Sequence, residues 1–158
     1  MILQCDNFWE ISTKGIRFRI DKRTGSLIRL VIDVEREFIW TEHPGNVCVR
    51  DDYVGRTIGR ESISHIEFFQ QKDTLLVRKV FNDVPWILTE KYSVLEDTIH
   101  WDAELSMTSG EFRSCEIRYQ LPWPQPLYPM EWWTAKEGMP SAPHRFSLIS
   151  FEYGEITS

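Results

Sequence analysis

Alternation of apolar and polar residues, in short runs separated by polar turns, is the feature that most constrains how this chain can fold. Ile16, Phe18 and Ile20 share one face of a run, the residues DKRTG supply a turn, and a second apolar run covers residues 27–32. Side chains with a period of two point to opposite faces of a β-strand. The pattern therefore predicts a β-hairpin over residues 16–32.

The middle of the chain repeats this pattern in four runs between residues 64 and 107. Short polar turns separate the runs at Lys72-Asp73, near residues 83–85 and at Glu96-Asp97. Strands with this spacing predict an antiparallel meander. One face of the meander is expected to meet a core and the other to meet water or a ligand. The expected core residues of the last two runs are Trp86, Leu88, Tyr92, Val94, Ile99, Trp101, Ala103, Leu105 and Met107.

Alternation continues over residues 115–121 and resumes in residues 144–154, after a segment that contains several prolines. Proline lacks the N–H that a central strand donates, so the intervening segment is predicted to be a loop. No apolar pattern of helical period extends over three turns. We therefore predict an all-β fold with little helix, an antiparallel two-sheet β-sandwich that forms a single domain over residues 1–158.

Charge and composition exclude several classes of function. The net charge of -6 argues against binding to nucleic acid or to an anionic membrane surface. Cys5, Cys48 and Cys115 lie far apart and form no C-x-x-C pair, so we expect reduced, mostly buried thiols, no metal site and no cofactor. The N-terminal residues lack the basic and apolar regions of a secretory signal, which predicts a cytoplasmic protein.

One group of candidate catalytic residues is His100, Asp102 and Glu104, in the run IHWDAEL. A period of two places all three on the polar face of one strand, where an imidazole and two carboxylates can exchange protons or bind a cation. The alternative is a solvated face that complements the apolar face of the same strand, and this is the interpretation that we favour.

The run VCVRDDYVGR holds two adjacent carboxylates, Asp51 and Asp52, between Arg50 and Arg56. Adjacent side chains on an extended strand point in opposite directions, which argues against a catalytic pair. We expect local ion pairs with the two arginines instead.

Candidate carbohydrate-binding residues occur in two places. Glu116 and Arg118 belong to a polar strand face that would form one surface with the His100 face if the two strands were neighbours. The proline-rich loop holds four large aromatic residues, which suit the C–H patches of sugar rings. The alternatives are a solvated strand face and aromatic rings that are buried under the loop or packed on a neighbouring domain. The four aromatic residues of the loop are Trp123, Tyr128, Trp132 and Trp133.

The hairpin turn DKRTG, the run SVLEDTIHWDAEL and the late segment FEYGE together resemble the galactose-mutarotase-like super-sandwich found ahead of the catalytic domain in several glycoside hydrolases. This resemblance implies an accessory β-sandwich whose loops complete the substrate cleft of a following catalytic domain. The catalytic glutamate and histidines of a free-standing mutarotase have no matching positions here. We therefore expect the chain to be the N-terminal part of a longer protein.

Three hypotheses about function follow. The first is a non-catalytic, carbohydrate-associated domain of a glycoside hydrolase, with carbohydrate and a downstream catalytic domain as its partners. The second is a β-barrel that holds a small apolar ligand in a lumen lined by Trp86, Tyr92 and Trp101. The third is a stand-alone sugar-active enzyme, such as an epimerase, that uses His100, Asp102 and Glu104.

Overall fold

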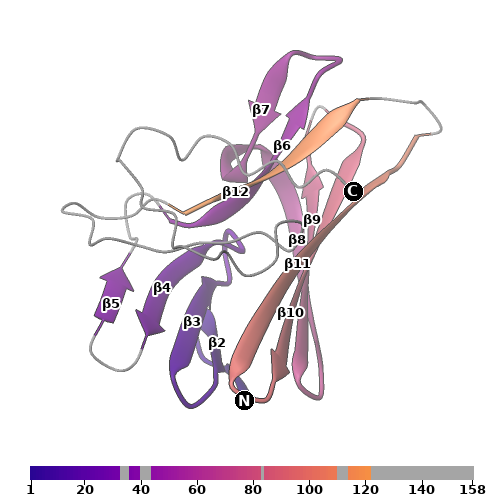
Figure 1. The fold of residues 1–158 in the computed structure, drawn as a ribbon. Coiled ribbons are helices and arrows are strands. Elements are labelled where there is room, and N and C mark those ends of the chain that lie inside the picture. Colours follow the sequence, from indigo (N-terminus) through magenta and orange to yellow (C-terminus); the bar gives the residue numbers. More distant parts are fainter. Residues whose placement is uncertain (33–35, 40–43, 83, 110–113, 122–158) are drawn as a thin grey trace. The chain divides into compact units, whose positions relative to one another are not determined.

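The computed structural model describes residues 1–32, 36–39, 44–82, 84–109 and 114–121. By its internal contacts the chain divides into two compact units, Met1–Pro122 and Trp123–Ser158, and all the described residues belong to the first. Apart from a short 3-10 turn at Arg60–Ser62, the regular elements of this part are strands (Figure 1). They are β1 (Ile2–Gln4), β2 (Phe8–Ser12), β3 (Ile16–Asp21), β4 (Leu27–Ile32), β5 (Arg36–Ile39), β6 (Asn46–Asp51), β7 (Arg56–Ile58), β8 (Ile63–Gln71), β9 (Thr74–Phe81), β10 (Trp86–Leu95), β11 (Thr98–Met107) and β12 (Cys115–Gln120).

In the described part of the chain, these strands form three antiparallel sheets. Sheet A has the order β1-β2-β3-β4-β5, sheet B the order β12-β6-β7 and sheet C the order β11-β10-β9-β8. Leu27 and Gly45 exchange two backbone hydrogen bonds of 2.8 Å, which connect the start of β4 to the residue that precedes β6. Sheets A and B therefore make one layer and sheet C makes the other. The all-β sandwich, the hairpin over residues 16–32 and the four-stranded meander are confirmed.

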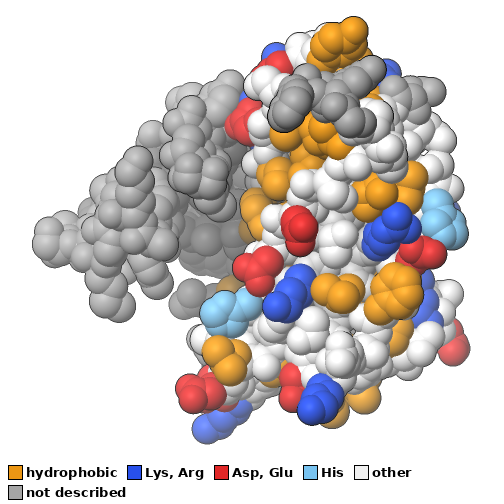
Figure 2. Space-filling view, turned by 90° about the vertical axis from the view of Figure 1, so that its right-hand side faces the viewer, with side chains coloured by type: hydrophobic (Ala, Val, Ile, Leu, Met, Phe, Trp, Pro, Cys, Tyr) orange, Lys and Arg blue, Asp and Glu red, His pale blue; other side chains and the backbone are white. Residues whose placement is uncertain are grey.

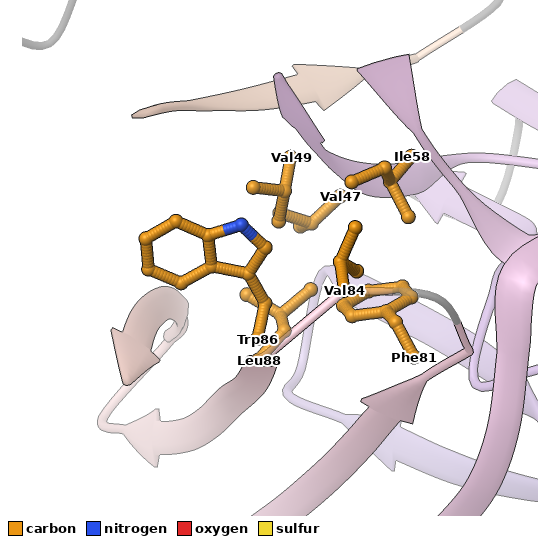
Figure 3. Packing of buried hydrophobic residues seen from close by; sticks show 7 residues of the cluster. All are labelled: Val47, Val49, Ile58, Phe81, Val84, Trp86 and Leu88. Atoms are coloured by element: carbon orange, nitrogen blue, oxygen red, sulfur yellow. The ribbon is translucent and has the colours of Figure 1, made fainter. Parts of the chain in front are cut away.

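Residues from both layers meet in an apolar core (Figure 3). Val47, Val49 and Ile58 of sheet B point toward side chains of the β9–β10 hairpin. Inward-facing residues of β11 and β12, among them Leu105 and Ile117, pack against this cluster. The predicted apolar faces of β10 and β11 do face the core, because alternate side chains of a strand share one side of the sheet. The buried residues that the hairpin contributes are Phe81, Val84, Trp86 and Leu88.

The inward face of sheet C also carries a fully buried ion pair. The ammonium of Lys79 on β9 contacts Oε1 of Glu90 on β10, and neither side chain is exposed. Oε2 of Glu90 accepts hydrogen bonds of 2.8 Å from the Tyr92 hydroxyl and from the Trp101 indole N–H. Burial, followed by the neighbouring Glu90 carboxylate, raises the pKa of Tyr92 well above its ordinary value, so the phenol keeps the proton that it donates.

The turn between β3 and β4 packs against this buried pair. Oδ2 of Asp21 accepts hydrogen bonds from the backbone N–H of Thr24, at 3.0 Å, and from its hydroxyl, at 2.6 Å. The turn ends at Gly25, which has a φ of +63°. A Cβ atom at Gly25 would lie 2.5 Å from Cε of Lys79 and 2.6 Å from Cδ1 of Ile66. The glycine thus allows sheet A to approach sheet C at the buried ion pair.

A matched pair of glycine variants tests this close approach. Gly55 has a similar φ of +67°, but a Cβ atom there would meet no atom of the described residues within 4 Å. Gly55→Ala should cost about 1 kcal/mol, the penalty of a left-handed alanine. Gly25→Ala should cost about 3 kcal/mol, because overpacking against Lys79 adds to that penalty. Urea unfolding of both variants measures the difference, and equal costs would contradict the role of Gly25.

A second prediction concerns the buried ion pair. Lys79→Met should lower the free energy of unfolding by about 3–5 kcal/mol, because it leaves the Glu90 carboxylate buried without its cation. The double variant Lys79→Met/Glu90→Gln should recover at least about 1 kcal/mol of this loss, since a neutral amide oxygen still accepts from Tyr92 and Trp101. Lys91→Met, on the exposed face of β10, is the control and should change stability by less than about 0.5 kcal/mol. A cost for Lys79→Met as small as that of the control would refute the prediction.

Candidate functional site

The structure places His100, Asp102 and Glu104 on the exposed face of β11, the end strand of sheet C in the described part of the chain. Their neighbours across the strand pair are Ser93, Lys91 and Thr89 of β10. Figure 2 views the side on which sheet C lies in Figure 1, and acidic, basic and apolar side chains are interspersed over it. The triplet therefore shares one face, as predicted, and that face is open to solvent.

Glu116 and Arg118 lie on β12, whose partner in sheet B is β6. Nη2 of Arg118 contacts Oε2 of Glu116 at 2.6 Å. Tyr119 on the same strand points inward and meets the Trp101 ring edge-to-face, with 5.1 Å between centroids. Because β11 and β12 belong to different sheets and turn these aromatic residues toward each other, their polar faces point away from each other. The structure does not combine the two polar faces into one surface.

The adjacent carboxylates of the β6–β7 hairpin differ in role. Asp52 pairs with Arg50 at 3.4 Å, as expected for a local ion pair. Asp51 is fully buried, and its Oδ2 accepts a 2.7 Å hydrogen bond from the indole N–H of Trp86. Its Oδ1 accepts from the backbone N–H of Tyr53 at 2.9 Å. Asp51 therefore links the hairpin turn to the core, a role that the expectation of local ion pairs missed.

The aromatic residues proposed to line a lumen pack on one another instead. Tyr92 stacks on Trp101 with centroids 5.3 Å apart, and Trp86 belongs to the core cluster between sheets B and C. Among the described residues, these side chains therefore pack against core neighbours, which argues against a lumen lined by them. The remaining candidates, Trp123, Tyr128, Trp132 and Trp133, lie outside the described residues.

A groove of about 510 Å³ lies where the ends of sheets A and C meet, between strands β1 and β2 on one side and β8 on the other. Trp9 forms its floor and stacks against Phe68 with centroids 6.3 Å apart. Apolar side chains, two glutamines and one lysine line the groove, and no acidic residue is among the lining residues. The lining residues are Gln4, Trp9, Lys22, Ile66, Phe68 and Gln70.

Strand register explains why these residues meet. Gln4 on β1 is the direct partner of Trp9 on β2. Ile66, Phe68 and Gln70 alternate along β8 and so share one face. The amide nitrogen of Gln70 donates to the carbonyl of Ile2 at 3.3 Å, which links β8 to β1. Sequence reasoning missed this groove because period-two patterns assign residues to faces but do not say which sheet ends adjoin.

Neither a metal-binding group nor a membrane-spanning helix occurs in the described ranges. They hold no group of histidine, cysteine or acidic side chains that is arranged to bind a metal ion. They also contain no helix that is both long enough and apolar enough to span a bilayer.

Burial, followed by repulsion from Glu61, raises the pKa of the Cys48 thiol to about 11. The expectation of mostly buried thiols is correct only for Cys48, since Cys5 is half-buried and Cys115 is exposed.

Comparisons with protein families, curated proteins and solved structures give no significant match to this chain. The resemblance to a galactose-mutarotase-like domain therefore stays a hypothesis.

The cysteines give a direct test of the burial pattern. A thiol with a pKa near 11 is almost entirely protonated at pH 8, and the thiolate is the reactive form. Burial, followed by Asp51 and Asp52, also raises the pKa of Cys115, but this thiol is exposed to the reagent. Iodoacetamide at pH 8 should therefore modify Cys115 well before Cys48, which should stay unmodified until the protein unfolds. Peptide mapping by mass spectrometry, with and without urea, measures both rates. Modification of Cys48 as fast as Cys115 in the folded protein would contradict the structure.

Proposed function

We propose that this chain is a non-catalytic, carbohydrate-associated β-sandwich domain of a sugar-processing enzyme of the glycoside hydrolase type. The observation that supports the proposal is the groove between β1, β2 and β8, where apolar surface and planar amides converge. In this proposal the groove holds part of a saccharide chain, and a catalytic domain elsewhere in the protein carries out the chemistry.

The groove offers the two kinds of contact that sugars require. The half-buried side chains of Phe68 and Ile66 present apolar surface for the C–H patches of a pyranose ring. Exposed Gln4 and Gln70 carry amides, which both donate and accept hydrogen bonds and so match hydroxyl groups. The volume of about 510 Å³ falls within the usual range for small-molecule sites.

The exposure of the His100 triplet supports a non-catalytic role. Acid–base groups of enzymes usually lie in clefts, within hydrogen-bond reach of the bound substrate. His100, Asp102 and Glu104 instead alternate along a solvated strand face. The filled space around Trp101 and Tyr92 likewise disfavours an apolar ligand inside the sandwich.

Calorimetric titration with a panel of neutral oligosaccharides tests the proposal. Gln4→Ala should weaken binding of the best ligand about fivefold, the equivalent of one hydrogen bond of about 1 kcal/mol. Phe68→Ala should weaken it at least as much, whereas Phe69→Ala should have no effect, because Phe69 is exposed on the opposite face of β8. The absence of binding to every saccharide, or equal binding by all three variants, would refute the assignment.

Two further variant sets separate the groove from the other candidates. Trp132→Ala and Trp133→Ala test the proline-rich loop, and loss of binding in these variants alone would move the site there. His100→Ala should leave saccharide binding unchanged. Turnover of a sugar substrate that depends on His100 would overturn the non-catalytic assignment.

A further inference from the structure

Lys22 lines the groove with a positive charge, and its ammonium forms no ion pair with a carboxylate of the described residues. It lies in the β3–β4 turn, and its ammonium sits 5.8 Å from the centroid of the Trp9 ring. The ammonium donates one hydrogen bond, at 3.3 Å, to the backbone carbonyl of Asp6. A lysine ammonium has three donors, so two remain for a ligand.

Neighbouring cations of the two sheets are paired differently. Arg19 on β3 donates to Glu10 at 2.9 Å, and Arg78 on β9 donates to Glu67 at 2.8 Å. Each of these guanidinium groups is therefore already paired with a carboxylate of the same chain. Lys22 instead has an aromatic ring and a neutral carbonyl as its contacts, so its charge is available to a ligand.

The charge of the groove limits what it can bind. A cationic ligand would be repelled by Lys22, which already contacts the Trp9 ring in the way that a ligand cation would. A neutral sugar would not use the ammonium. A carboxylate would accept a charge-assisted hydrogen bond from it, which is stronger than a bond between neutral groups.

We infer that the groove selects saccharides that carry carboxylates, uronic-acid oligosaccharides, with Lys22 pairing with the carboxylate. The amides of Gln4 and Gln70 bind hydroxyl groups of the same or the adjacent sugar unit. This inference rests on the proposed carbohydrate-binding function and adds the class of sugar. Because the whole chain carries a net charge of -6, a long polyanion gains no attraction at a distance, and selectivity must come from direct contact with Lys22.

Titration of the full chain with uronic-acid oligosaccharides and with their methyl esters tests the inference. Esterification removes the negative charge and keeps the sugar backbone, so the acid should bind about tenfold more tightly than the ester to the native protein. In Lys22→Met this preference should disappear while the ester binds as before. Lys91→Met removes the same charge from the exposed face of β10 and should keep the preference. Circular dichroism and thermal unfolding confirm that the variants are folded.

The outcomes distinguish the inference from the proposed function. If the acid and the ester bind equally, or if Lys22→Met keeps the preference, Lys22 does not select carboxylates, although the groove still binds saccharide. If neither form binds, the proposed function itself fails. If inorganic phosphate or a simple carboxylate such as acetate competes as well as the oligosaccharide does, the site is an anion site without sugar recognition, and the inference is overturned.

Discussion

The ion pair between Lys79 and Glu90 lies on the inward face of sheet C, and the turn at Gly25 of the other layer packs directly against it. Both charges lie on the core face of sheet C, where an unpaired charge costs several kcal/mol. A shift of β9 against β10 by one residue would turn Lys79 away from Glu90 and move apolar side chains to solvent. The pair thus fixes strand register, orients Trp101 and Tyr92 through Glu90, and sets the space that Gly25 must fit.

The groove lies where the end strands of the two layers adjoin. In the described part of the chain, β1 and β8 are end strands of sheets A and C, and side chains of both strands line the groove. Trp9 closes the bottom of this gap against Phe68, and glutamines occupy its rim. The turn that brings Gly25 to the buried ion pair also carries Lys22, so the same short segment contributes to packing and to the proposed recognition of acidic sugars.

The predictions succeeded where one face of a strand is buried and the other is solvated. The runs that became β3, β4 and β8 to β11 alternate clearly, and their turns were placed correctly. β6 was less apparent, since Val47 and Cys48, on opposite faces, are both buried. Glu90 interrupts the apolar face of β10 because it pairs with Lys79 of β9, a contact that only the folded structure reveals. The groove was missed because Gln4 and Gln70 are distant in the chain and meet through sheet packing.

The sequence by itself determined the all-β class, the strands of the meander and the faces on which their side chains lie, because the period of a strand is a local property. Tertiary structure decided which faces and ends adjoin. It separated the polar faces of β11 and β12 by placing them in different sheets, and it brought Lys22 to Trp9 at the end of the sandwich. These pairings depend on contacts between residues far apart in the chain, which local periodicity does not encode.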